Sequence, residues 1–133
     1  GRTSTAEIAR RLNMAPSAIF ERIKKLEASD VIQGYHAKLD AKALGLGLLA
    51  YVFVRSDDKV GESNAGERLA EIPEVLEVHH IAGEDCFLVK VRAPDTEALG
   101  RLLRDRFGGI ESIRSTRTTI VLSSIKEGSR IPV

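Results

Sequence analysis

The sequence predicts an α+β protein, with a short helical part followed by a longer part of order βαββαβ. Apolar residues recur at helical spacing in residues 4–26, and four β-rich stretches alternate with helical patterns after residue 47. The chain has 133 residues, of which 43% are apolar and 29% charged, as is typical of a folded protein. We expect domains at 1–40 and 48–133, joined by a linker at 41–47.

A first helix is predicted from about Thr5 to Leu12. Ser4 and Glu7 have the spacing of a capping box, in which each side chain bonds a free backbone N–H at the helix start. Apolar residues then recur at helical spacing at Ile8, Ala9 and Leu12. Residues 13–15 interrupt the pattern, so we expect a tight turn there.

A second helix is predicted from Pro16, because proline suits the first helical turn. Its apolar stripe, which we expect to be buried, consists of Ile19, Phe20, Ile23 and Leu26. The opposite side carries Ser17, Ala18, Glu21, Arg22 and Lys25. Two short helices joined by a tight turn are typical of a helix-turn-helix, in which small residues approach a DNA groove. In this interpretation Arg22 reaches a base edge or a phosphate, and Lys24 and Lys25 contact phosphates.

Charge is unevenly distributed along the chain. Net charge is only +1, but residues 1–25 hold six Lys and Arg against two Asp and Glu. A solvated helix with Glu21 and Lys25 as an i,i+4 pair has the same pattern, so spacing alone leaves both interpretations open. Residues 31–40, extended in character around Gly34, predict a hairpin wing that adds a second backbone contact.

The second part of the chain predicts a ferredoxin-like fold. Its strands are expected at 48–55, 75–81, 86–92 and 113–125, and its helices at 65–72 and 95–107. Right-handed crossovers then give a four-stranded antiparallel sheet with both helices on one face. Whichever way the first strand is oriented, the other face presents either Tyr51 and Phe53 or Val52 and Val54. Such a patch predicts face-to-face pairing of two sheets.

Other classes of protein are disfavoured by the sequence. Cys86 is the only cysteine, which excludes an intrachain disulfide and fits a reducing cytoplasm. No apolar run is long enough to span a membrane, and no signal segment opens the chain, which begins at Gly1 and is expected to continue upstream in its parent protein. An enzyme would need Cys86, His79 and His80 to act together, but adjacent strand residues point to opposite faces. We therefore expect no catalytic residues, no metal and no cofactor.

These residues resemble a known family. The stretch AEIARRLNMAPSAIFERIKKLEASDVIQGY resembles the winged helix-turn-helix of the Lrp/AsnC (feast/famine) transcriptional regulators. VHHIAGEDCFLVKVRAPD and IRSTRTTIVL resemble the ferredoxin-like ligand-sensing domain of that family. The resemblance implies a regulator that binds double-stranded DNA as a multimer, built from homodimers that assemble into tetramers or octamers. It also implies an amino acid as effector, bound between dimers. The alternative is a stand-alone amino-acid sensor or oligomerisation module without DNA binding.

The resemblance also implies the effector residues. Residues 83–87 (GEDCF) occupy the position of the family's glycine–acid–x–acid–aromatic signature, and the implied site consists of Gly83, Glu84, Asp85, Cys86, Thr116 and Thr118. Glycine lets backbone N–H groups approach a carboxylate, and Glu84 or Asp85 can pair with an α-ammonium. Without the resemblance, the same residues read as an ordinary solvated turn.

The chain departs from the family pattern in three places. The family's first helix has no counterpart here, and the integrity of the DNA-binding part depends on it. Ala15 replaces the usual serine cap, an expected loss of about 1 kcal/mol of helix stability. Cys86 stands where many members have a second acid, which predicts a different effector.

Overall fold

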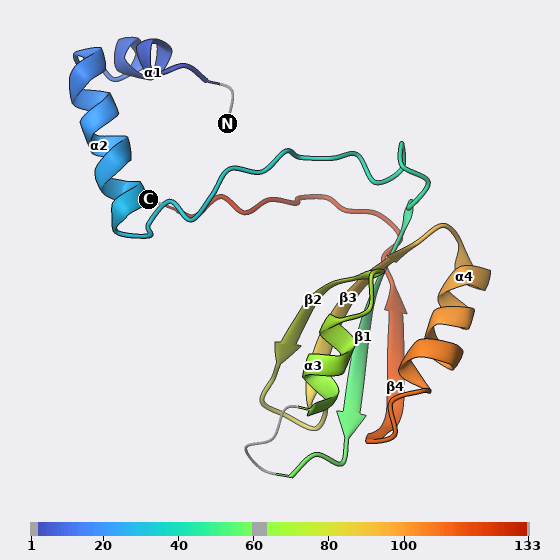
Figure 1. Ribbon diagram of the computed structural model, residues 1–133. Helices are drawn as coiled ribbons and strands as arrows, with labels where there is room; N and C mark the ends of the chain where they lie inside the picture. Colours follow the sequence, from blue (N-terminus) through green and yellow to red (C-terminus); the bar gives the residue numbers. More distant parts are fainter. Residues whose placement is uncertain (1–2, 60–63, 133) are drawn as a thin grey trace. The chain divides into compact units, whose positions relative to one another are not determined.

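The computed structural model describes residues 3–59 and 64–132 of the chain (Figure 1). The chain forms two compact units, an N-terminal unit (Gly1–Leu39) and a C-terminal unit (Asp40–Val133). None of the helices in the described ranges is long and apolar enough to cross a membrane. Over the same ranges, no group of three or more His, Cys, Asp and Glu could hold a metal ion.

The N-terminal unit consists of α1 (Thr5–Arg11) and α2 (Pro16–Ala28). Ala9 and Ile19 are its buried apolar residues, 1% and 3% exposed, one from each helix. Small and branched side chains at these two positions let the short helices pack closely. The predicted pair of helices is therefore present.

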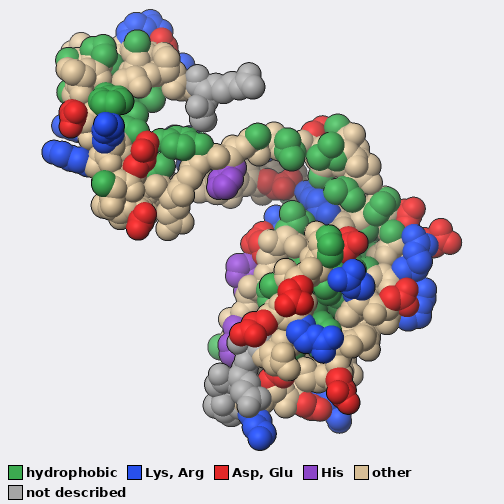
Figure 2. All heavy atoms as spheres, viewed as in Figure 1, with side chains coloured by type: hydrophobic (Ala, Val, Ile, Leu, Met, Phe, Trp, Pro, Cys, Tyr) green, Lys and Arg blue, Asp and Glu red, His purple; other side chains and the backbone are tan. Residues whose placement is uncertain are grey.

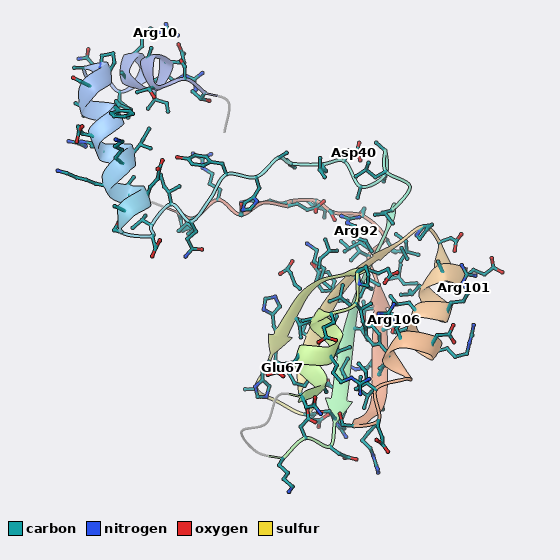
Figure 3. The ribbon with its side chains drawn as sticks, viewed as in Figure 1. Arg10, Asp40, Glu67, Arg92, Arg101 and Arg106 are labelled. Atoms are coloured by element: carbon teal, nitrogen blue, oxygen red, sulfur yellow. The ribbon has the colours of Figure 1, made fainter. Side chains whose placement is uncertain are left out.

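Only half of the predicted capping box at the start of α1 forms. The backbone N–H of Glu7 donates to Ser4 Oγ at 3.1 Å, as predicted. The Glu7 carboxylate does not complete the box, because it binds Arg10 and Arg11 on the next turn. These hydrogen bonds lower the pKa of Glu7, with Arg10 the larger cause. Figure 3 shows Arg10 projecting from the outside of α1.

The turn between α1 and α2 depends on a left-handed residue. Asn13 has φ 55°, and the N–H of Met14 donates to the carbonyl of Ala9 at 2.8 Å. This is the Schellman arrangement, which caps the free carbonyls at the end of a helix. Asp30, with φ 60°, ends α2 in the same way. Asparagine and aspartate tolerate this conformation better than other non-glycine residues.

The predicted hairpin wing over residues 31–40 does not form, since this segment contains no strand. A tight two-residue hairpin turn needs a positive φ, and Gly34 does not have one. The segment is instead tied back to α2, because the Tyr35 hydroxyl donates to Glu27 Oε1 at 2.7 Å. That hydrogen bond raises the pKa of Tyr35.

The C-terminal unit has the predicted βαββαβ order. Its elements are β1 (Leu48–Ser56), α3 (Asn64–Ala70), β2 (Val75–His80), β3 (Phe87–Ala93), α4 (Thr96–Arg101) with the π-helical turn η1 (Leu102–Phe107), and β4 (Ile113–Ile120). The sheet order is β2-β3-β1-β4, and all neighbouring strands are antiparallel. The expected strand to residue 125 is shorter in the structure. Val121 still donates to the carbonyl of Leu49, but β1 begins at Leu48 and offers later residues no partner.

One face of this sheet carries the core. Val52, Val54, Val89 and Val91 are fully buried on it, packed with residues of α3, α4 and η1 such as Leu69, Leu99 and Phe107. Figure 1 shows α3 in front of the sheet, and Figure 2 shows Lys and Arg intermixed with Asp and Glu over this helix-bearing face. Both helices therefore cover one face, as predicted.

The other face, here called the open face, carries Tyr51, Phe53 and Leu88. Strand register places Phe53 directly opposite Leu88 on β3 and Arg117 on β4. Within one chain these three apolar side chains are only half-buried. The pair that faces away from the helices is thus Tyr51 and Phe53.

Candidate DNA-binding and effector-binding sites

The outer face of α2 carries both acidic and basic side chains. Glu21, Arg22 and Lys25 are exposed together with Ser17, while Ala18 is half-buried. In the described part of the chain, none of Glu21, Arg22 and Lys25 forms an ion pair. The predicted Glu21–Lys25 pair is therefore absent, and both cations on this face are available to an anion.

The two units differ in charge. Residues 1–39 hold seven Lys and Arg against four Asp and Glu, an excess of three positive charges. Residues 40–133 hold thirteen Lys and Arg against fifteen Asp and Glu, an excess of two negative charges. The positive excess thus belongs to the unit with the two short helices, where attraction to an anionic surface would act.

Lys24 lies on the flank of α2 rather than on its outer face. Its ammonium is 4.8 Å from the centroid of the Phe20 ring, a cation–π contact. Helical geometry places Lys24 about 60° from Glu21 and on the side away from Arg22. Of the six predicted contact residues, Lys24 therefore sits at the edge of the set.

A groove of about 910 Å³ lies between α1, α2 and the segment that follows α2. It is lined by Thr3, Thr5, Ile8, Arg11, Leu12, Phe20, Ile23, Lys24, Glu27, Ile32 and Tyr35. Leu12, Phe20 and Tyr35 are 60%, 49% and 61% exposed, and Figure 2 shows hydrophobic side chains at the surface of this unit. The expectation that Phe20 and Leu26 belong to the buried stripe is wrong, since both are exposed (49% and 40%), because the two helices cover only the Ile19 side of α2.

In the C-terminal unit, residues 83–86 form the turn between β2 and β3. Gly83 has φ 133°, a conformation that residues with a Cβ rarely adopt. A Cβ added at Gly83 would meet nothing within 4 Å. Backbone conformation, rather than crowding by this chain, therefore requires glycine here, and open space lies beside it.

The two acids of this turn have different environments. The Asp85 side chain is 19% exposed, and its Oδ2 accepts a hydrogen bond from Arg117 Nη2 at 2.9 Å. The Glu84 side chain is 93% exposed, and its nearest cation is Arg55 at 3.9 Å. Asp85 is thus tightly paired, whereas Glu84 is held loosely.

Arg117 joins the 83–86 turn to the open face of the sheet. Its guanidinium carbon lies 4.3 Å from the centroid of the Phe53 ring, so the charge stacks on an aromatic face while it binds Asp85. The sequence reasoning missed Arg117 and Arg55. The alternation of side chains along a strand could have indicated Arg117, because it places Arg117 on the opposite face from Thr116 and Thr118.

Thr116 and Thr118 do not point toward these carboxylates. They lie opposite Val54 and Val52 of β1, which places both hydroxyls on the helix-bearing side of β4. The backbone N–H of Cys86 does donate to the carbonyl of Val54 at 2.9 Å. The turn and Thr116 are therefore close along the sheet, but one chain does not gather the acids and the hydroxyls on a single face.

The Cys86 thiol ties the turn to the end of β1. Its half-buried sulfur accepts from the Ser56 N–H at 3.5 Å and lies 3.6 Å from the Ser56 carbonyl, to which the S–H donates. The two histidines point to opposite sides, as predicted. His79 bonds Glu77 at 2.9 Å, whereas the His80 ring stacks on Phe87, with 5.1 Å between centroids.

Comparison with known proteins decides the family. Residues 49–131 match the family described as Lrp/AsnC ligand binding domain, and residues 1–33 match the family described as winged helix-turn-helix DNA-binding. The first match alone spans more than half of the chain. The chain belongs to the Lrp/AsnC family.

Relatives in sequence cover the whole of this Lrp/AsnC chain. HTH-type transcriptional regulator FL11 of Pyrococcus horikoshii is 37% identical over 134 residues, which is 100% of the chain and 87% of the regulator. The leucine-responsive regulatory protein of Salmonella typhimurium is 30% identical and covers 100% of the chain, which spans 82% of that protein. Such relatives are transcriptional regulators, which confirms the prediction that this Lrp/AsnC protein is not an enzyme.

Solved structures agree with this assignment. The feast or famine regulatory protein of M. tuberculosis, complexed with L-methionine, has a TM-score of 0.87 and 33% identity, with 99% of this chain and 89% of that one covered. A transcriptional regulator of Neisseria meningitidis, also in complex with L-Met, has a TM-score of 0.90 and 26% identity over 99% of this chain and 86% of that one. The predicted α+β class and the predicted family are thus confirmed.

Proposed function

We propose that this Lrp/AsnC protein is an amino-acid-responsive transcriptional regulator that binds double-stranded DNA as a multimer. The observation that carries the DNA-binding part is the outer face of α2, where Arg22 and Lys25 are exposed and form no ion pair with any residue that the structure describes. Cations in this state can replace the counterions of DNA phosphates without first breaking an intramolecular pair. Ser17 and Ala18, near the start of the helix, are small enough to allow close approach to a groove.

A salt titration of DNA binding tests this face. Arg22→Ala and Lys25→Ala should each weaken binding to a duplex of mixed sequence, and each should flatten the dependence of log affinity on log salt by about one unit. Arg104→Ala is the control, because Arg104 is an exposed cation (69%) of the C-terminal unit that pairs with Asp105 at 3.6 Å. Equal binding by all variants at every salt concentration would reject this face. Failure of the parent protein to bind DNA would favour the alternative, a sensor without DNA binding.

We propose that the effector is an amino acid bound between dimers, in contact with residues 83–86 and with Thr116 and Thr118. The open space beside Gly83 and the exposed carboxylate of Glu84 support this site. In one chain the acids and the threonine hydroxyls face opposite sides of the sheet, so a site that uses both needs a second copy. Relatives solved with L-methionine support the amino-acid class.

The proposed dimer pairs the open faces of two sheets, and further assembly gives a tetramer or an octamer. Tyr51, Phe53 and Leu88 would lose their remaining exposure in such a dimer, which favours it by the hydrophobic effect. An effector bound between dimers changes the assembly only if its affinity differs between the assembled states. Oligomer mass measured with and without amino acids therefore reports effector action directly.

A further inference from the structure

The charges around the 83–86 turn form one tight pair and one loose pair. Asp85 and Arg117 are 2.9 Å apart, with Asp85 only 19% exposed. Glu84 and Arg55 are 3.9 Å apart, with side chains 93% and 49% exposed. The cluster contains two acids and two cations, so its net charge is zero.

The tight pair has several constraints that hold it closed. Breaking the hydrogen bond between Arg117 and the mostly buried Asp85 carboxylate would cost free energy, because the carboxylate would lose its partner without regaining full contact with water. The Arg117 guanidinium also stacks on the Phe53 ring at 4.3 Å, which fixes its position on the sheet. A ligand ammonium that approached Asp85 would therefore meet a carboxylate already neutralised and a cation beside it.

The loose pair can open to receive a ligand. Exposed ion pairs at this distance contribute little to stability, so separating Glu84 from Arg55 costs little. Glu84 can then bind an α-ammonium, and Arg55 can bind an α-carboxylate through its two parallel N–H donors. These two groups satisfy the charges of one zwitterion, and within the cluster of one chain the remaining acid and cation, Asp85 and Arg117, are paired with each other.

We propose that the ion pair with Arg117 makes the Asp85 carboxylate unavailable to the effector. The effector is thereby restricted to amino acids with uncharged side chains. This inference rests on the proposed effector function and names the ligand class of that site. A lysine or arginine side chain would need a second acid, and Cys86 supplies none because its thiol is bonded to the backbone of Ser56. A glutamate or aspartate side chain would need a second cation, and Arg117 is occupied by Asp85.

Calorimetry against L-methionine, L-leucine, L-lysine and L-glutamate tests the restriction. The parent protein should bind methionine or leucine at least about tenfold more tightly than lysine or glutamate, the difference expected for one charged hydrogen bond. Arg117→Gln frees Asp85, so lysine affinity should rise about tenfold relative to methionine. Asp85→Asn frees Arg117, and glutamate affinity should rise instead. The two variants thus predict opposite changes, which loss of folding would not produce.

Arg114→Gln is the matched control. Arg114 lies on the same strand as Arg117, is also 67% exposed, and pairs with Asp57 at 3.2 Å. Its removal should leave the ratio of methionine to lysine affinity unchanged. Tightest binding of lysine or glutamate by the parent, or an unchanged ratio in Arg117→Gln, would overturn the inference while the effector function stands. Absence of heat with every amino acid would overturn both.

Discussion

Ala15 is the N-cap of α2, yet its side chain makes no capping hydrogen bond. Its backbone angles, φ −68° and ψ 141°, already suit a capping residue. Ala15→Ser should therefore stabilise the N-terminal unit by about 1 kcal/mol, because the hydroxyl can accept a free N–H of the first turn. Thermal unfolding followed by far-ultraviolet circular dichroism measures the change. Ser4→Ala, which deletes the existing cap of α1, should cost a similar amount; a stabilising effect of Ser4→Ala would contradict this account of the helix ends.

Glu77 links stability to pH. Hydrogen bonds from His79, and then from Lys90, lower the pKa of its carboxyl group. A carboxylate whose pKa is lower in the folded state contributes stability above its unfolded pKa, and loses it as pH falls through the folded pKa. Glu77→Gln should therefore reduce the acid-side loss of stability seen in denaturant titrations at several pH values. Glu111→Gln, which removes an exposed acid without an ion pair in the described residues, should leave that loss as in the parent.

At the level of single residues, the sequence predicted the helix caps but not the directions in which the side chains of the candidate effector site point. Ser4 and Ala15 were assigned correctly as caps, because capping depends on local spacing. The effector threonines were chosen by resemblance, and register now places them on the other face from Asp85. Arg117 was missed because its importance comes from Phe53 and Asp85, which are far from it in sequence.

The packing of α3 depends on one glycine. A Cβ at Gly66 would lie 2.7 Å from Cε1 of Phe87, a ring that is only 3% exposed and cannot move freely. Gly66→Ala should therefore destabilise the C-terminal unit by about 1–3 kcal/mol through overpacking. Gly100→Ala in α4 is the matched variant, because a Cβ there meets nothing within 4 Å. It should stabilise α4 by about 0.5–1 kcal/mol. Equal shifts of the unfolding midpoint for the two variants would refute the contact.

At the level of elements, the sequence predicted those helices and strands whose position depends on local sequence patterns. The helices and the four strands follow from periodicity and turn residues, whereas the sequence left open which face of β1 is buried. The hairpin at 31–40 was wrong, because β-propensity creates no strand where the chain offers no partner to pair with. The end of β4 was overestimated for the same reason, since β1 supplies no residues beyond Leu48.

At the level of the whole molecule, the open face tests the proposed dimer. Phe53→Lys should place a charge beside Arg117 and inside the paired faces, so the dimer should dissociate. An aspartate is less informative at this position, because Arg117 can neutralise it. Ala70→Lys adds the same charge at an exposed position of α3 and should leave the assembly intact. Light-scattering masses that are identical for the parent and Phe53→Lys would reject face-to-face pairing.

The order of the sheet leaves β2 and β4 as its two edge strands, with backbone groups available to any extended chain. Charged side chains lie on both edges, with Glu77 on β2 and Arg114 and Arg117 on β4. When the β4 edges of two copies align, their arginines repel each other, which disfavours pairing of these two edges. Without these charges, an edge strand rich in β-branched residues such as β4 would be a template for aggregation. We therefore expect the arginines of β4 to disfavour pairing of two β4 edges, whatever assembly the sheet faces form.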